Sequence, residues 1–175
     1  MSSSRDKRHV APFVGPPWFA AAAWLLGAAV ADTTVVHFFA VRDVVPSLVL
    51  VAVVWYAIRV DVLRAAVYGL AAGLCEDVLA AQTGAAWTIS TIATATLTSV
   101  LSRGFFADSI PLVGGVTAIA TLVRALLFWT VMSLEGYPGG LGGMHLRQAF
   151  VAAALNVAVM IAAMLVVRRF NVREA

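Results

Sequence analysis

Charged residues are scarce in this sequence, and their scarcity excludes an ordinary soluble domain. Lys, Arg, Asp and Glu make up 12% of the chain, whereas 62% of its residues are hydrophobic. Soluble domains contain about 25% charged and about 45–50% apolar residues. A chain of 175 residues leaves much of its surface exposed, so its own core cannot hold the excess. Lipid must cover that surface, and we therefore predict an all-α integral membrane protein.

Cysteine and histidine are equally scarce. The single Cys75 excludes an internal disulfide and a multi-cysteine metal site. The three histidines are scattered, without the spacing of metal ligands. The sequence also lacks a Gly-rich phosphate loop, a Ser or Cys nucleophile with a nearby base, and the signature of membrane lipid-headgroup transferases. These absences favour a scaffold or carrier over an enzyme, and we predict no cofactor and no bound metal.

Six apolar segments are predicted to cross the membrane as helices. A membrane-spanning helix needs about 20 residues. The six segments are residues 18–39, 44–58, 64–81, 85–101, 110–134 and 146–167. The second is short, but Pro46 is tolerated in a first helical turn and Arg59 can snorkel from the other end. We expect one transmembrane domain at 18–167, an N-terminal tail at 1–17 and a C-terminal tail at 168–175.

The placement of Lys and Arg predicts the orientation of these spans. If both termini are cytoplasmic, two basic residues, Arg42 and Arg147, lie outside, and Arg124 lies within a span. The inside would hold Arg5, Lys7, Arg8, Arg59, Arg64, Arg103, Arg168, Arg169 and Arg173. This bias and the even number of spans predict cytoplasmic termini. The basic residues form no basic face with interleaved aromatics, so we expect no nucleic-acid partner.

The N-terminal region resembles a signal peptide in its basic start. Ala29, Val30 and Ala31 even offer a small-x-small cleavage pattern. The apolar run at 18–39 is nevertheless long enough to span a membrane. We therefore expect an uncleaved first helix.

Small residues follow one side of two predicted helices. Such residues let a second backbone approach closely, which makes them typical of helix interfaces in membranes. In the third span they recur every four residues and are followed at the same spacing by Asp77. We predict helix-packing or partner interfaces at Ala65, Gly69, Gly73, Gly84, Ala23, Gly27 and Ala31.

Five polar residues lie at comparable depth in the outer half of the predicted spans. They are Asp32, Glu76, Asp77, Arg124 and Asn156. A charge at the membrane centre costs about 2.5–3.5 kcal/mol on insertion scales, so we predict a buried polar layer in which Arg124 pairs with Asp77, Glu76 or Asp32. One arginine does not balance these carboxylates, and water, a protonated acid or a partner must supply the rest.

Two interpretations of the polar layer are open. In the first, polar contacts fix the register of the helices, at about 1 kcal/mol per contact. In the second, the layer lines an outward-opening pocket or a path for protons or ions. The outer connection at 134–148 has five glycines and a proline and cannot be regular helix throughout, so it is either a flexible or partner-ordered loop or a lid over that pocket. The structural interpretation is the simpler one.

Three features of the segment from Pro46 to Leu101 are typical of one family. A proline opens the second span in PSLVLVAVVWYAI, the third span carries a Gly-Leu-x-x-Asp element at Gly73 to Asp77, and Gly84 opens the fourth span. Together with the length of the chain and its six-span plan, these features resemble those of the rod shape-determining protein MreD family. The long basic N-terminal tail, Glu76 beside the aspartate and the Gly-rich outer connection depart from the family pattern.

The resemblance implies a multi-pass protein of the bacterial inner membrane that acts as a non-enzymatic scaffold of the rod, or elongation, complex. Such a protein would bind an MreC-like single-span protein and the rod-complex peptidoglycan synthase pair, a glycosyltransferase and a transpeptidase, within membrane lipid. It would support peptidoglycan synthesis and cell-shape maintenance.

An alternative function comes from a second resemblance. The six-helix plan is similar to the membrane substrate-binding components of energy-coupling-factor transporters. The chain would then be the small-molecule, vitamin-like binding component of an importer. The tryptophans are dispersed rather than gathered around a ligand-sized site, which favours the scaffold.

Overall fold

The computed structural model describes residues 17–80, 84–102 and 109–171, and in these residues the chain is helical and has no strands. The all-α prediction is therefore confirmed for this part of the chain. The elements are α1 (Trp18–Thr34), η1 (Val36–Phe39), α2 (Leu48–Ala57), α3 (Val62–Ala80), α4 (Ala86–Leu101), α5 (Ile110–Leu134), η2 (Gly139–Leu141) and α6 (Gly142–Asn171). Five arginines and lysines used in the predicted orientation, Arg5, Lys7, Arg8, Arg103 and Arg173, lie outside the described residues.

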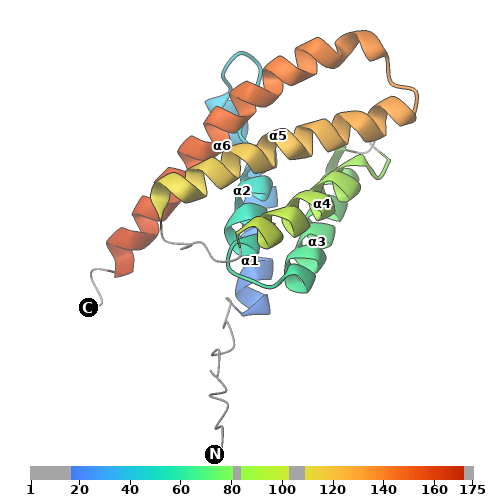
Figure 1. Cartoon of the computed structure of the whole chain (residues 1–175). Helices are drawn as coiled ribbons and strands as arrows, with labels where there is room; N and C mark the ends of the chain where they lie inside the picture. The colour runs from blue at the N-terminus through green and yellow to red at the C-terminus, as the bar shows by residue number, and fades with distance from the viewer. Residues whose placement is uncertain (1–16, 81–83, 103–108, 172–175) are drawn as a thin grey trace, which may run out of the picture.

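Two of these helices are long and apolar enough to cross a membrane, namely α5 and residues Gly142–Arg169 of α6. They pack against each other as an antiparallel pair along one side of the molecule (Figure 1). The bounds of α5 match the predicted span. The sixth helix starts at Gly142, four residues before the predicted start. The Gly-rich connection between the two helices is therefore shorter than expected.

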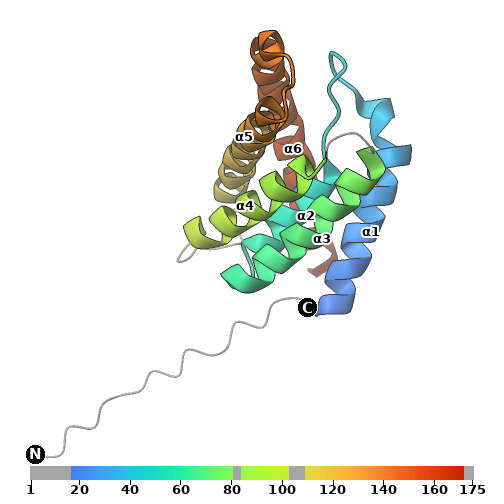
Figure 2. The same ribbon diagram turned by 90° about the vertical axis from the view of Figure 1, so that its right-hand side faces the viewer.

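The short helix α2 lies at the centre of the molecule. Seven of its ten residues are buried, and Val53 and Val54 are completely inaccessible. A helix that is hydrophobic on all sides is a core helix. In agreement, α2 packs against α1, α3, α4, α5 and α6 (Figure 2).

Because α2 has only ten residues, it is about 15 Å long and begins inside the molecule. The predicted second span, 44–58, was too long at its start. The chain reaches α2 through a tight turn, closed by two backbone hydrogen bonds between Val41 and Val44, and through a non-helical segment at Val45 and Pro46. Arg42 and Asp43 at the centre of this turn both have positive φ, 53° and 63°, as a type I′ turn requires.

Consecutive helices run in opposite directions. The start of α1 and the end of α6 consequently lie at the same end of the molecule, and the connection between α5 and α6 projects at the other end (Figures 1 and 2). The first helix ends at Thr34 and is followed by the short η1 helix, so it is shorter than the predicted span at 18–39.

The helices α3 and α4 form the closest pair in the described part of the chain, and glycines make this approach possible. A Cβ atom on Gly69 would lie 2.8 Å from the Cβ of Ala95 and 3.0 Å from the carbonyl oxygen of Thr91. A Cβ atom on Gly73 would overlap the Cα of Thr88 and lie 2.9 Å from the carbonyl oxygen of Trp87. At Gly73 the obstacle is backbone, which cannot rotate away.

We expect the substitution Gly73→Leu to separate α3 from α4 and to destabilise the protein by at least about 1–3 kcal/mol, the usual cost of overpacking. The matched control is Gly115→Leu, because a Cβ at Gly115 has no described atom within 4 Å. Thermal unfolding of both purified variants in the same detergent measures the difference. Equal unfolding temperatures for the two variants would contradict the proposed contact.

Candidate functional site

The polar residues of the predicted layer lie in one network of contacts that reaches all six helices. Hydrogen bonds link α1 to α2, α2 to α5 and α6, α3 to α4, and α5 to α3 and α6. The network is organised around two helix N-termini, those of α2 and α4. The starts of both helices are at least partly buried, so their backbone N–H groups need acceptors from other parts of the chain.

Asp32, near the end of α1, provides the acceptors for the N-terminus of α2. Its two carboxylate oxygens accept hydrogen bonds from the backbone N–H of Leu48 at 2.8 Å and of Val49 at 3.1 Å. A helix N-terminus carries unsatisfied donors and a partial positive charge of about half a unit, so a carboxylate is the group best suited to it. Asp32 therefore holds the end of α1 against the start of α2.

Ser47 and Asn156 complete the same N-terminus. Ser47 is the N-cap residue, and its hydroxyl oxygen accepts from the N–H of Leu50 at 3.1 Å. The N–H of Ser47 donates to Oδ1 of Asn156 at 2.8 Å, and Nδ2 of Asn156 donates to the hydroxyl of Thr121 at 3.1 Å. This buried amide thus joins α6 to both α2 and α5.

Asp77 gives the N-terminus of α4 the same kind of support from the neighbouring α3. Its carboxylate accepts hydrogen bonds from the N–H of Trp87 at 3.1 Å, from the N–H of Thr88 at 2.8 Å and from the hydroxyl of Thr88 at 2.6 Å. Gly73, one turn earlier on α3, lets α4 come close enough for these bonds to form. The Gly-Leu-x-x-Asp element is therefore a device that packs and caps α4.

Arg124 connects the two capped helix ends. Its side chain is almost fully buried, Nη2 donates to Oε1 of Glu76 at 2.5 Å, and Nη1 donates to the hydroxyl of Ser47 at 3.3 Å. The guanidinium also lies over the ring of Trp87, 4.5 Å from its centre, in a cation–π contact. Of the three carboxylates that the sequence offers to Arg124, the structure places Glu76 in direct contact.

The N-termini of α2 and α4 contribute to the charge balance of the polar layer in addition to the charged side chains. One arginine faces three carboxylates, but two of these carboxylates cap helix N-termini, each equivalent to about half a positive charge. The remaining carboxylate, Glu76, pairs with Arg124 and also accepts a long hydrogen bond of 3.4 Å from the hydroxyl of Thr91. Helix termini therefore supply much of the positive charge that the side-chain count lacks.

Several members of the network carry no charge and were not singled out from the sequence. Ser47, Trp87 and Thr121 are examples. Ser47 directly precedes an apolar helix, which is the pattern of an N-cap residue, so its role could have been inferred. The contact of Trp87 with Arg124 has no signal in the local sequence.

His145 lies within the predicted outer connection at 134–148, but it is helical. It lies in the first turn of α6, its Nε2 is 3.0 Å from the carbonyl oxygen of Ala125, and its ring stacks at 5.4 Å on Trp129 and at 6.0 Å on Phe128. His145 thus joins the first turn of α6 to the C-terminal half of α5.

The predicted small-residue interfaces have three different surroundings. Ala65, Gly69 and Gly73 are on α3, and the two glycines abut α4. Gly84 lies in the turn before α4 with φ of 55°, and a Cβ there would be 3.0 Å from a carboxylate oxygen of Glu135. The small residues on α1 have another environment, because Ala23, Gly27 and Ala31 line a cavity.

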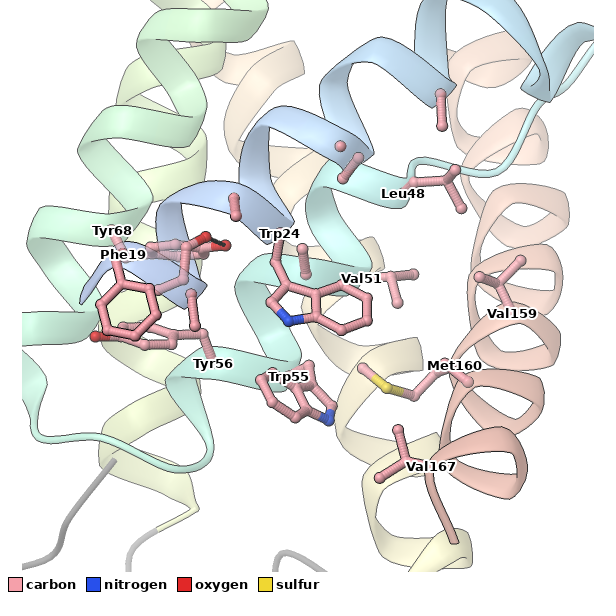
Figure 3. A pocket seen from close by; sticks show the side chains of 18 residues that line it. Phe19, Trp24, Leu48, Val51, Trp55, Tyr56, Tyr68, Val159, Met160 and Val167 are labelled. Atoms are coloured by element: carbon pink, nitrogen blue, oxygen red, sulfur yellow. Dashed lines mark hydrogen bonds between the residues drawn. The ribbon is translucent and has the colours of Figure 1, made fainter. Parts of the chain in front are cut away.

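This cavity has a volume of about 680 Å³ and lies between α1 and α6, with α2 as its floor (Figure 3). We call it the α1–α6 groove. Its lining is apolar and aromatic, and none of the five predicted polar-layer residues belongs to it. The polar layer and the groove are therefore separate features.

Comparison with known proteins identifies no relative. No family model, no curated protein and no solved structure matches this chain significantly.

The capping role of Asp32 can be tested by the substitution Asp32→Ala. It leaves the N–H groups of Leu48 and Val49 without their acceptors inside the molecule, at a cost of about 1–3 kcal/mol for each unsatisfied group. The matched control is Asp61→Ala. Asp61 accepts from the N–H of Arg64 at 3.0 Å but is exposed, so water can replace it.

We expect Asp32→Ala to lower the unfolding temperature in detergent clearly more than Asp61→Ala. Asp32→Asn should have an intermediate effect, because the amide retains one acceptor oxygen. If Asp32→Ala and Asp61→Ala unfold at the same temperature, the capping role of Asp32 is refuted.

The ion pair between Glu76 and Arg124 can be tested with a double-mutant cycle. Glu76→Gln or Arg124→Gln alone leaves a buried charge without its partner, which costs about 3–5 kcal/mol. The double variant should be milder than the sum of the two single variants by about 0.5–3 kcal/mol.

The control cycle uses Asp61 and Arg64, which form an ion pair at 3.4 Å with both side chains about half exposed. Such exposed pairs contribute little, so this cycle should be close to additive. Unfolding free energies of all variants give both coupling energies. Additive effects at Glu76 and Arg124 would rule out a significant pair.

Proposed function

We propose that this chain is a six-span, non-enzymatic scaffold of the bacterial rod complex, embedded in the inner membrane with both termini cytoplasmic. It binds an MreC-like single-span protein and the peptidoglycan synthase pair, and thereby supports peptidoglycan synthesis and cell-shape maintenance. This function rests on the resemblance to the MreD family.

The observation that best supports the proposal is the role of the motif that carries the resemblance. Gly73 admits the backbone of α4, and Asp77 caps that helix. Pro46 precedes the capped start of the central helix α2. These residues act on the architecture of the molecule, as expected for positions that define a family of scaffolds rather than a family of enzymes.

The surface of the helices supports the proposed place in the membrane. Large apolar side chains point outward from all helices except the central α2, for example Phe19 on α1, Leu63 and Val78 on α3 and Leu126 on α5, with 63–78% of their surface exposed. Monomeric soluble proteins rarely expose apolar patches of such extent. The alternating helix directions are compatible with both termini on one side. The short α2, about 15 Å long, needs the non-helical residues before it to complete a crossing.

The alternative, a vitamin-binding component of an importer, receives less support. Such a carrier would enclose its ligand against the outer polar layer. In this chain the oxygens of Asp32 and Asp77 accept hydrogen bonds from helix N-termini, and Glu76 binds Arg124. The α1–α6 groove contains none of these groups and lacks the convergent polar side chains that orient a small polar ligand.

Affinity purification of the tagged full chain in mild detergent tests the proposal. We expect recovery of an MreC-like protein and of the glycosyltransferase–transpeptidase pair. Gly73→Leu should lose these partners together with its own fold, whereas Gly115→Leu should retain them. Recovery of an ATPase-linked transporter module with a bound vitamin, without wall-synthesis proteins, would refute the scaffold and favour the importer.

A further inference from the structure

Beyond Trp87, a row of aromatic rings continues away from Arg124, and the proposed scaffold function does not use it. The guanidinium of Arg124 lies 4.5 Å from the ring centre of Trp87, and the ring of Phe128 stacks on Trp87 with 4.0 Å between the ring centres. Phe128 follows Arg124 by four residues on α5, so it lies one helical turn nearer to the connection between α5 and α6. The row therefore leads from the buried ion pair toward the end of the molecule at which α5 and α6 are joined (Figure 1).

The next rings come from α6, from α5 and from the connection between them. His145, in the first turn of α6, stacks on Phe128 at 6.0 Å and on Trp129 at 5.4 Å. Tyr137, in the connection, meets the ring of Trp129 edge-on at 6.2 Å. We call these five side chains the aromatic row: Trp87, Phe128, Trp129, Tyr137 and His145.

Burial falls along the aromatic row. The side chains of the ion pair, Arg124 and Glu76, are 4% and 14% exposed, whereas Tyr137 at the far end is 47% exposed. The four rings between them are half-buried. Residues 135–138 of the connection are exposed and not helical, and exposed irregular backbone is unstable in hydrocarbon, so this end of the molecule belongs in water. The aromatic row thus lies between that water and the ion pair.

The start of α6 fixes the outer part of the aromatic row. Nε2 of His145 is 3.0 Å from the carbonyl oxygen of Ala125. A Cβ atom on Gly142 would lie 3.3 Å from Cζ2 and 3.4 Å from Cε2 of Trp129, so a side chain there would displace this ring. A Cβ atom on the next residue, Gly143, has no described atom within 4 Å. The positions of the rings therefore depend on how α6 begins.

We propose that the aromatic row is a lid, closed in this structure, that keeps water from the Glu76–Arg124 ion pair and from the capped N-terminus of α4. Exclusion of water strengthens the electrostatic contacts beneath the lid. Trp87 belongs both to the row and to the first turn of α4, where its N–H donates to Asp77 at 3.1 Å. Displacement of the rings at the start of α6 consequently loosens the start of α4. The connection between α5 and α6 thereby controls access to the polar layer, whether or not the chain acts as a scaffold.

Hydrogen exchange of the full chain in detergent, followed by mass spectrometry, tests the lid. The readout is the exchange rate of the amides in the first turn of α4, compared with the rate around Val53 in the core of α2. We expect Phe128→Ala to raise the rate in α4 by about tenfold and to leave the rate in α2 unchanged. The matched control is Leu126→Ala, because Leu126 is also on α5 but is 63% exposed and outside the row.

Two results with Phe128→Ala would overturn the lid. The first is an unchanged exchange rate at the start of α4. The second is an equal rise in α4 and in the core of α2, because it would show that the ring only stabilises the fold as a whole.

The role of the connection is tested with the neighbouring substitutions Gly142→Leu and Gly143→Leu. Only the first places atoms against Trp129, so we expect only Gly142→Leu to raise the exchange rate at the start of α4. If Gly142→Leu does not fold, Gly142→Ala is the milder variant, compared with Gly143→Ala. Equal rates in the two members of a pair would overturn the proposed control of the lid by the start of α6.

Discussion

Buried helix N-termini are the constraint on which this structure depends. Each α-helix begins with backbone N–H groups that have no partner in the same helix, and water is not available to them in an apolar environment. The first turns of α2 and α4 are both at least partly buried. Asp32 and Asp77, from the helices α1 and α3, supply the missing acceptors. Burying a carboxylate costs free energy, and both carboxylates lie where a helix N-terminus already supplies a partial positive charge.

The remaining parts of the fold follow from these two capped ends. Capping of α2 from α1 and α6 fixes the central helix, and five helices then pack around its apolar surface. Capping of α4 from α3 requires the close approach that Gly73 permits. Arg124 joins the two ends through Glu76 and Ser47, so that a shift of one helix disturbs the contacts of several others.

The sequence predicts the bounds of α4 and α5 to within one residue but misplaces the starts of α2 and α6. The bounds of α5 agree with the apolar run at 110–134, because a long uninterrupted run has a single interpretation. The start of α2 was misplaced because Val44 and Val45 are as apolar as the helix that follows them. The start of α6 was missed because Gly142 and Gly143 indicate a loop, while the structure packs Gly142 against the ring of Trp129.

The charged residues of the polar site could be predicted from the sequence, but the contacts between them could not. Charge within apolar segments singled out Asp32, Glu76, Asp77 and Arg124. The choice of Glu76 as partner of Arg124 depends on how α3 faces α5, which no local pattern encodes. The count of charges was incomplete because helix termini also carry charge, and the termini were not yet located.

The hydrogen bond between Ser47 and Asn156 joins residues that are 109 positions apart. It has a consequence for the order of events during synthesis. The second helix leaves the ribosome long before the sixth, so the N–H of Ser47 at its start has no native acceptor until Asn156 of α6 has been made. The early hairpin of α1 and α2 therefore lacks one of its native hydrogen bonds until α6 is present.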